Sequence, residues 1–191
     1  MKKKTIVLII ISVLLIAACA FAYWYFVLST SGDDTAKQQT TQSEADKPVS
    51  DKDLAALIAD TSNLSTFNES LKATGLATTL EGVGPFTVFA PSNSAFSDLP
   101  SGTLDRLQKP ENSQIMAGIL NYHIAPGSLL ASQMTDAQKI KTVNAQEVVV
   151  SLADSNVYII DAKGGKALVT KADIKAKNGV IHIIDAVLLP Q

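Results

Sequence analysis

The chain is poor in the residues that build disulfides, thiolate metal sites and nucleic-acid interfaces. Its one cysteine, Cys19, lies in an apolar run near the amino end, so the folded remainder can hold neither a disulfide nor a cysteine-ligated metal. Arg106 is the only arginine, and three of the 16 basic residues, Lys2–Lys4, precede the apolar run. From Ser29 onward 18 acidic residues therefore face 13 basic ones, a formal charge of −5. Because phosphate-backbone binding depends on clustered cations, we expect no nucleic-acid partner.

One long apolar segment stands out against this polar background. Residues Thr5 to Leu28 are apolar except for Thr5 and Ser12. As a helix this run would be about 36 Å long, which exceeds a hydrocarbon core of about 30 Å. The lysines before it and the acidic residues after it favour a cytoplasmic amino end. We therefore predict a signal anchor over residues 1–28 that attaches the protein to a membrane.

Two other interpretations of this segment stay open. Ile16-Ala17-Ala18-Cys19 resembles a bacterial lipoprotein cleavage box, which would make Cys19 a lipidation site. Ala20-Phe21-Ala22 resembles a small-x-small signal cleavage site. The aromatic residues from Tyr23 to Phe26 favour the uncleaved anchor, because such side chains prefer the membrane interface. All three interpretations predict a membrane-anchored or exported protein whose folded part lies on the extracytoplasmic side, at the cell surface.

The segment after the anchor differs in composition from the rest. Residues 29–50 are mainly Ser, Thr, Asp, Gln, Lys and Glu and include no aromatic residue. Such a composition buries too little apolar surface to offset the entropy of ordering, so we predict a polar stalk. We find no internal repeat in the remainder, and we assign residues 51–191 to one domain.

Helical periodicity comes first in this domain. Apolar residues recur at helical spacing from Leu54 to Leu71, behind the N-cap types Ser50 and Asp51, and again between Pro110 and His123. A strand is predicted over Phe86–Ala90.

Ser92 and Asn93 follow that strand as caps of a short helix. The last third changes period and predicts four further strands, at Glu147–Leu152, Val157–Ile160, Ala167–Thr170 and Gly179–Leu189. Helices first and strands later indicate an α+β fold with a mostly antiparallel sheet.

Few residues could carry chemistry. The chain lacks a nucleophile elbow, a zinc-binding helix and a phosphate-binding glycine loop, so we expect no catalytic residue, no cofactor and no metal site. Ser92, His123 and Asp185 could be drawn as a triad, but nothing in their spacing supports one. His182 and Asp185 belong to an apolar strand, where buried polar groups need hydrogen-bond partners. His123 ends a predicted helix, where it can meet unpaired carbonyls.

Three stretches in order resemble the fasciclin family: Phe86-Thr87-Val88-Phe89-Ala90-Pro91-Ser92-Asn93-Ser94-Ala95-Phe96, Asn121-Tyr122-His123-Ile124-Ala125-Pro126-Gly127, and Asn178-Gly179-Val180-Ile181-His182-Ile183-Ile184-Asp185-Ala186-Val187-Leu188-Leu189-Pro190. The chain is similar to a bacterial, membrane-anchored member with a single domain. The resemblance implies a wedge-shaped β-sandwich with helices packed along one side, used for cell adhesion or matrix binding.

The resemblance also implies roles for individual residues. Seven positions match those that the family marks, and their implied role is to lock strands and turns through buried hydrogen bonds; they are Asn93, Tyr122, His123, Asn178, Gly179, His182 and Asp185. Asp173-Ile174 and Tyr122-His123 resemble proposed partner contacts of animal members, although the residues flanking Asp173-Ile174 differ from the animal pattern. Ala145 stands where many members have glycine, which predicts a turn that does not need a positive φ.

These observations favour a noncatalytic surface module that binds an extracellular protein or polysaccharide. Two alternatives stay open: binding of a small apolar ligand, a lipid or a pigment, in a groove between helices and sheet, and, as the lesser one, a hydrolase.

Overall fold

The computed structural model describes residues 49–191. The predicted signal anchor over residues 1–28, the lipidation alternative at Cys19 and residues 29–48 of the predicted stalk lie outside the described residues. Within residues 49–191, no helix combines the length and the apolar character needed to cross a bilayer.

Short helices dominate the first half of the domain and strands the second, which confirms the α+β prediction. The helices are α2 (Leu54–Asp60), α3 (Ser65–Ala73), α4 (Ala77–Leu80), α5 (Asn93–Ser97), α6 (Thr103–Leu107) and α7 (Ser113–Tyr122), with single 3-10 turns at Ser62–Leu64, Pro110–Asn112 and Ala131–Gln133. The strands are β1 (Phe86–Pro91), β2 (Ile124–Pro126), β3 (Lys139–Lys141), β4 (Glu147–Ala153), β5 (Asn156–Ile160), β6 (Lys166–Ala176) and β7 (Gly179–Ile184).

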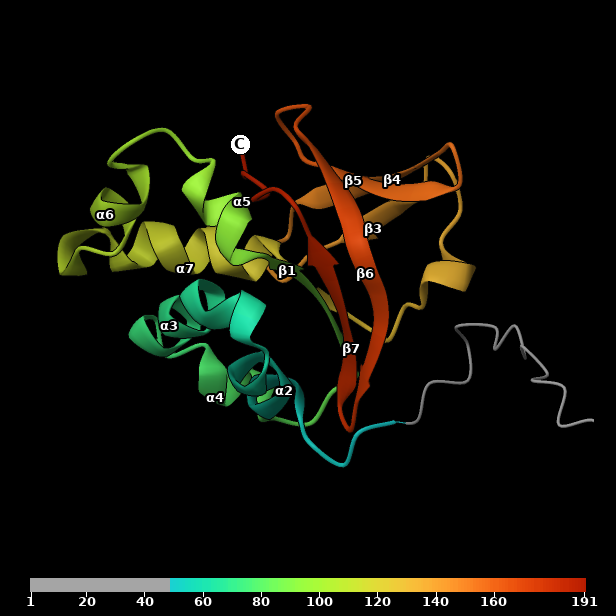
Figure 1. The fold of residues 1–191 in the computed structure, drawn as a ribbon, viewed down its shortest axis with the longest axis horizontal. Helices are drawn as coiled ribbons and strands as arrows, with labels where there is room; N and C mark the ends of the chain where they lie inside the picture. Colours follow the sequence, from blue (N-terminus) through green and yellow to red (C-terminus); the bar gives the residue numbers. More distant parts are fainter. Residues whose placement is uncertain (1–48) are drawn as a thin grey trace, which may run out of the picture. The chain divides into compact units, whose positions relative to one another are not determined.

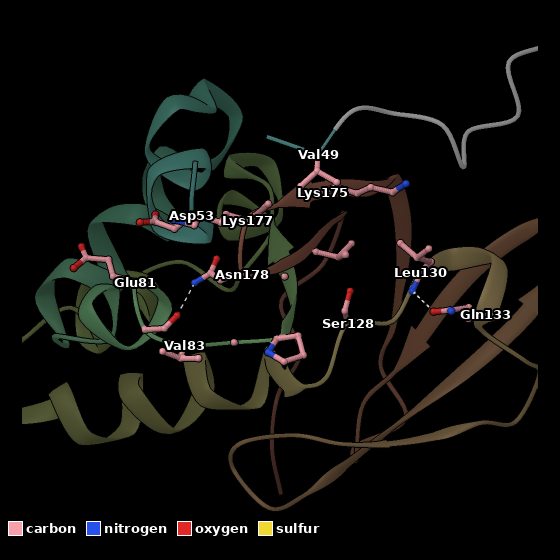
Figure 2. Close-up of a pocket in the computed structure, with 16 residues that line it drawn as sticks. Val49, Asp53, Glu81, Val83, Ser128, Leu130, Gln133, Lys175, Lys177 and Asn178 are labelled. Carbon is pink, nitrogen blue, oxygen red and sulfur yellow. Dashed lines mark hydrogen bonds between the residues drawn. The ribbon is translucent and has the colours of Figure 1, made fainter. Parts of the chain in front are cut away.

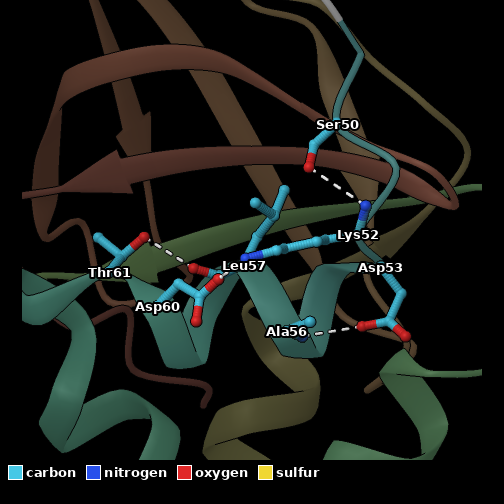
Figure 3. Close-up of polar contacts among 7 residues, drawn as sticks. All are labelled: Ser50, Lys52, Asp53, Ala56, Leu57, Asp60 and Thr61. Carbon is cyan, nitrogen blue, oxygen red and sulfur yellow. Dashed lines mark hydrogen bonds and ion pairs between the residues drawn. The ribbon is translucent and has the colours of Figure 1, made fainter.

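The first helix begins two residues later than its predicted caps suggested. Asp53, not Ser50 or Asp51, is the N-cap of α2, and its Oδ1 accepts a hydrogen bond from the Ala56 backbone at 2.8 Å (Figure 3). Ser50 instead accepts from the Lys52 backbone, and Lys52 forms an ion pair with Asp60 at the other end of the helix. Further along, Ser92 caps α5 as predicted.

The seven strands form one mixed sheet in the order β2-β1-β7-β6-β5-β4-β3. Five of its six strand pairs are antiparallel, which confirms the mostly antiparallel prediction; the exception is the central parallel pair of β1 and β7. Parallel pairing here requires a long crossover, and the helices from α5 to α7 lie within it. In Figure 1 the helices gather on the side of the sheet formed by β1 and β7.

The sheet is nearly closed on itself, where the family resemblance implied a sandwich. The long strand β6 pairs with β7 over much of its length and with β5 near its start, so it joins the two halves of the sheet. At the opposite ends, Val143 beside β3 donates its backbone N–H to the Ile124 carbonyl of β2 at 2.8 Å. The two layers of the predicted sandwich are thus halves of one strongly curved sheet.

Two apolar cores lie on opposite faces of the central strands. On β1, Val88 faces the helix-side core with Leu54, Phe67 and Leu120, whereas the next residue, Phe89, faces the core inside the curved sheet. Successive strand residues point to opposite faces, so β1 and β7 are buried on both. Every residue of β7 is buried, as the apolar run predicted.

The structure corrects two local expectations. Ala145 has φ +65°, so its turn adopts the left-handed conformation, and the prediction of a turn without positive φ was wrong. The last strand ends at Ile184, five residues before the predicted end at Leu189. The remaining segment crosses the inner core, where Leu188 is buried.

Candidate functional site

His123 sits at the C-cap of α7, fully buried. Its Nδ1 lies 2.8 Å from the Ile119 carbonyl and its Nε2 lies 3.0 Å from the Leu188 backbone nitrogen. An amide N–H must donate, so Nε2 accepts from Leu188 and the ring proton sits on Nδ1, donating to Ile119. Burial lowers the pKa of His123 to about 4, which keeps the ring neutral at neutral pH. The imidazole thereby ties helix α7 to the C-terminal segment.

Tyr122, the neighbouring residue, extends this connection to the sheet. Its hydroxyl donates to the Glu147 carbonyl of β4 at 2.9 Å and accepts from the Ala162 backbone after β5, also at 2.9 Å. Burial raises the pKa of this phenol, so it stays protonated and able to donate. Tyr122 and His123 together hold α7, β4, the turn after β5 and the C-terminal segment.

Asp161 completes this network and was missed by the sequence analysis. One carboxylate oxygen accepts from the backbones of Lys163 at 2.9 Å and Gly165 at 2.7 Å, and the other accepts from Leu189 at 3.0 Å. A Cβ at Gly165 would lie 2.8 Å from the carboxylate, so a larger residue there would displace the Asp161 side chain. The available signal was the turn sequence Asp-Ala-Lys-Gly-Gly between two predicted strands.

His182 has the opposite tautomer. Its Nε2 lies 2.8 Å from the Leu129 carbonyl, to which it donates, and its Nδ1 accepts from the Asp173 backbone at 3.4 Å. The ring stacks on Phe89 with centroids 5.8 Å apart. Burial lowers the pKa of His182, so this imidazole is also held neutral.

The proposed partner contacts turn inward. Asp173 is buried with φ +58°, and its carboxylate accepts from the Ala131 backbone at 2.8 Å. Ile174 packs against the helix-side core, and the side chains of Tyr122 and His123 are wholly buried. A partner that docks on the folded surface would therefore not reach the phenol or the imidazole, and Asp173 is already engaged.

Asn178 and Gly179 fix the turn between β6 and β7. The Asn178 side chain accepts from the Leu54 backbone at 2.9 Å and donates to the Leu80 and Gly82 carbonyls at 2.7 and 2.9 Å. Gly179 packs so closely that an added Cβ would collide with the Phe86 carbonyl. These two residues hold helices α2 and α4 against the sheet.

Asn93 and Asp185 make the remaining family contacts. Asn93 accepts from the Thr66 backbone at 3.1 Å and donates to the Ser62 carbonyl at 3.0 Å. Asp185 accepts from the Leu168 backbone at 2.7 Å, but it is exposed. The prediction of a buried carboxylate was wrong here, because β7 ends one residue earlier.

The structure does not assemble Ser92, His123 and Asp185 into a triad. Ser92 caps α5 and shares a hydrogen bond with Ser94, while both nitrogens of His123 bond to backbone groups. Within residues 49–191 no cluster of His, Cys, Asp and Glu side chains could hold a metal ion. In the same range every buried side-chain nitrogen or oxygen has a partner.

The described domain carries a groove of about 800 Å³, which we call the Val49–Val83 groove (Figure 2). It lies beside the turn between β6 and β7, between the loop after α4 and the segment after β2. Its rim and floor include Val49, Val83, Pro85, Leu130, Lys175 and Lys177. None of the predicted site residues except Asn178 and Gly179 lines it.

Comparison with known proteins agrees with this architecture. The fasciclin domain, as defined across its family, matches residues 62–190. Protein sll1483 of Synechocystis sp. is 37% identical over 159 residues, covering 81% of this chain and 85% of that protein. The pig transforming growth factor-beta-induced protein ig-h3 is 35% identical over 126 residues, 65% of this chain but only 17% of that longer protein.

A solved structure shows the same fold. It is a FAS1 domain pair from the insect cell adhesion molecule fasciclin I, with a TM-score of 0.65 at 20% sequence identity, covering 72% of this chain and 51% of that chain. The chain described here belongs to the fasciclin family, and residues 62–190 form its fasciclin domain.

Proposed function

We propose that this protein is a noncatalytic binding module, held on the extracytoplasmic side of a membrane, that attaches the cell to an extracellular protein or polysaccharide. The proposal rests on the structural role of the polar residues that match the family, above all the two histidines. Both histidines bond through both ring nitrogens to backbone groups and are held neutral. A buried imidazole that no substrate can reach is better explained as a structural residue than as a catalytic base.

Membership of the fasciclin family supports the same proposal. The insect structure with this fold belongs to a cell adhesion molecule. A membrane attachment through residues 1–28 would display many copies on one surface, so a weak individual contact would give strong attachment through multivalency.

The experiment is retention of the purified domain on whole cells, envelope polysaccharide and matrix protein, as a monomer and as a tetramer. We expect retention that rises steeply in the tetramer, with heat-unfolded domain as the control. Absence of retention on every surface would contradict binding. Turnover in a hydrolase screen that Ser92→Ala and His123→Ala abolish would favour the hydrolase alternative.

A second cavity gives a specific reason to keep the apolar-ligand alternative. It measures about 330 Å³, within the range of small-molecule pockets, and lies between α3, α6 and α7 rather than between helices and sheet. Leu107 and the buried Met116 line it, with Ser70 and Thr74 as polar neighbours.

Native mass spectrometry of the protein from its own host tests this alternative. A bound lipid or pigment that disappears in Ala73→Trp, which would fill the cavity, but persists in Lys72→Trp on the same helix would support it. If neither the unaltered protein nor the Lys72→Trp variant carried bound material, the alternative would be contradicted.

A further inference from the structure

The most exposed apolar side chains of the domain lie at one place. Val83 is 99% exposed and Val49 is 62% exposed, more than any other large hydrophobic residue in residues 49–191. Both line the Val49–Val83 groove, together with the exposed Pro85. Exposed apolar side chains grouped around a concavity mark an interaction surface better than scattered ones do.

The chain enters the domain at this same surface. Val49 is the first described residue, and the segment after it is fixed to the end of β6: the Ser50 N–H donates to the Lys175 carbonyl at 3.1 Å and the Lys177 N–H donates to the Lys52 carbonyl at 2.9 Å. The groove therefore lies at the end of the domain to which residues 1–48 are attached.

The length of the preceding segment decides which way this end faces. If residues 29–48 form the polar stalk that their composition predicts, their root-mean-square span is about 25 Å. A domain of 143 residues is roughly 35–40 Å across. Because the stalk would be shorter than the domain is wide, the groove end would on average face the bilayer.

The charge of the groove does not favour a strongly charged partner. Lys175 and Lys177 line it together with Asp53 and Glu81, two cations and two carboxylates. Contact with a lipid surface would then rest on Val49, Val83 and Pro85 at the boundary between headgroups and acyl chains, and it would depend little on salt.

We propose that the rim of the Val49–Val83 groove is a lipid-contacting surface that orients the domain on the bilayer and leaves its far side to the extracellular partner. The occupant is the outer leaflet of the membrane that carries the anchor. This inference rests on the membrane attachment in the proposed function.

The test uses the full chain in liposomes that contain phosphatidylcholine brominated near the headgroup. Trp24, the only tryptophan, is replaced by phenylalanine, and a single reporter is introduced by Val83→Trp. The matched control is Ile115→Trp on α7, an exposed position (58%) that does not line the groove. We expect blue-shifted, bromine-quenched emission from the Val83→Trp reporter, unchanged in high salt, and unshifted, unquenched emission from the Ile115→Trp reporter.

Equal emission from both reporters, or quenching that high salt removes, would overturn the proposal. Protein that does not float with the liposomes would overturn it together with the membrane attachment. Protein that floats but shows no quenching of the Val83→Trp reporter would overturn the lipid contact alone. A peptide or a second copy bound in the groove would shield the Val83→Trp reporter from solvent even in detergent without lipid. That result would also contradict the lipid contact.

Discussion

His123 makes the stability of this domain depend on pH in a way that one substitution can reveal. In the unfolded chain its pKa returns to about 6.5, whereas burial holds it at about 4 in the folded domain. Between these values the unfolded state binds a proton that the folded state does not, so stability falls as the pH falls from 6.5 towards 4. Above pH 6.5 His123 is neutral in both the folded and the unfolded state, so its full contribution to the stability of the domain is present there. The difference corresponds to about 3 kcal/mol of unfolding free energy.

The assay is urea unfolding of residues 42–191, the compact unit that contains the domain, followed by far-UV circular dichroism from pH 7.5 to 4.5. His123→Gln is the informative variant, because glutamine can still accept from Leu188 but does not titrate. The pKa of His182 is also lowered, so both proteins should lose stability on acidification. We expect the variant to be less stable at pH 7.5 and to lose less stability at low pH. If the unfolding free energy of the two proteins fell equally with falling pH, the lowered pKa assigned to His123 would be refuted.

Three further substitutions test individual contacts and turns of the domain. Asn178→Ala removes three hydrogen bonds and should lower the unfolding free energy by about 2–4 kcal/mol, measured by urea unfolding at pH 7.5, whereas a loss under 0.5 kcal/mol would show that the turn holds without them. Tyr122→Phe leaves a part-buried carbonyl and N–H without the hydroxyl and should cost about 1–3 kcal/mol; faster hydrogen exchange at Ala162 would identify the site of the loss, and unchanged exchange there would count against it. Ala145→Gly relieves a positive φ and should raise the thermal midpoint, with a gain of up to about 1 kcal/mol; a lower midpoint would mean that the turn gains nothing from glycine.

Periodicity predicted the order of elements because each helix and strand buries one or two faces. The apolar run of β7 indicated burial on both sides, and His123 was expected at a helix end from the proline and glycine that follow it. Local patterns of this kind depend on neighbouring residues, which the sequence displays directly.

Contacts between strands far apart in the chain could not be predicted from the sequence. The parallel pair of β1 and β7 joins residues about 90 positions apart, and the closure of the sheet depends on Val143 meeting Ile124. Neither contact has a local signal. The hydrogen bond from Leu189 to Asp161 spans 28 residues and has no local signal either, although the turn that Asp161 makes with Lys163 and Gly165 is local.

The Val49–Val83 groove was also beyond sequence reasoning. Val83 lies between two glycines, and Val49 lies in the segment assigned to the stalk. Exposure depends on which surfaces the rest of the fold covers, so an exposed valine is not distinguishable from a buried one before the chain is folded.

Surface attachment is tested most directly with native cells that produce either the full chain or residues 1–48 alone. We expect cells with the full chain to adhere to the surface that retains the purified domain, and we expect loss of residues 49–191 to abolish this adhesion while the remaining segment stays in the membrane. Equal adhesion of both strains, with the full chain present at the surface, would contradict this expectation.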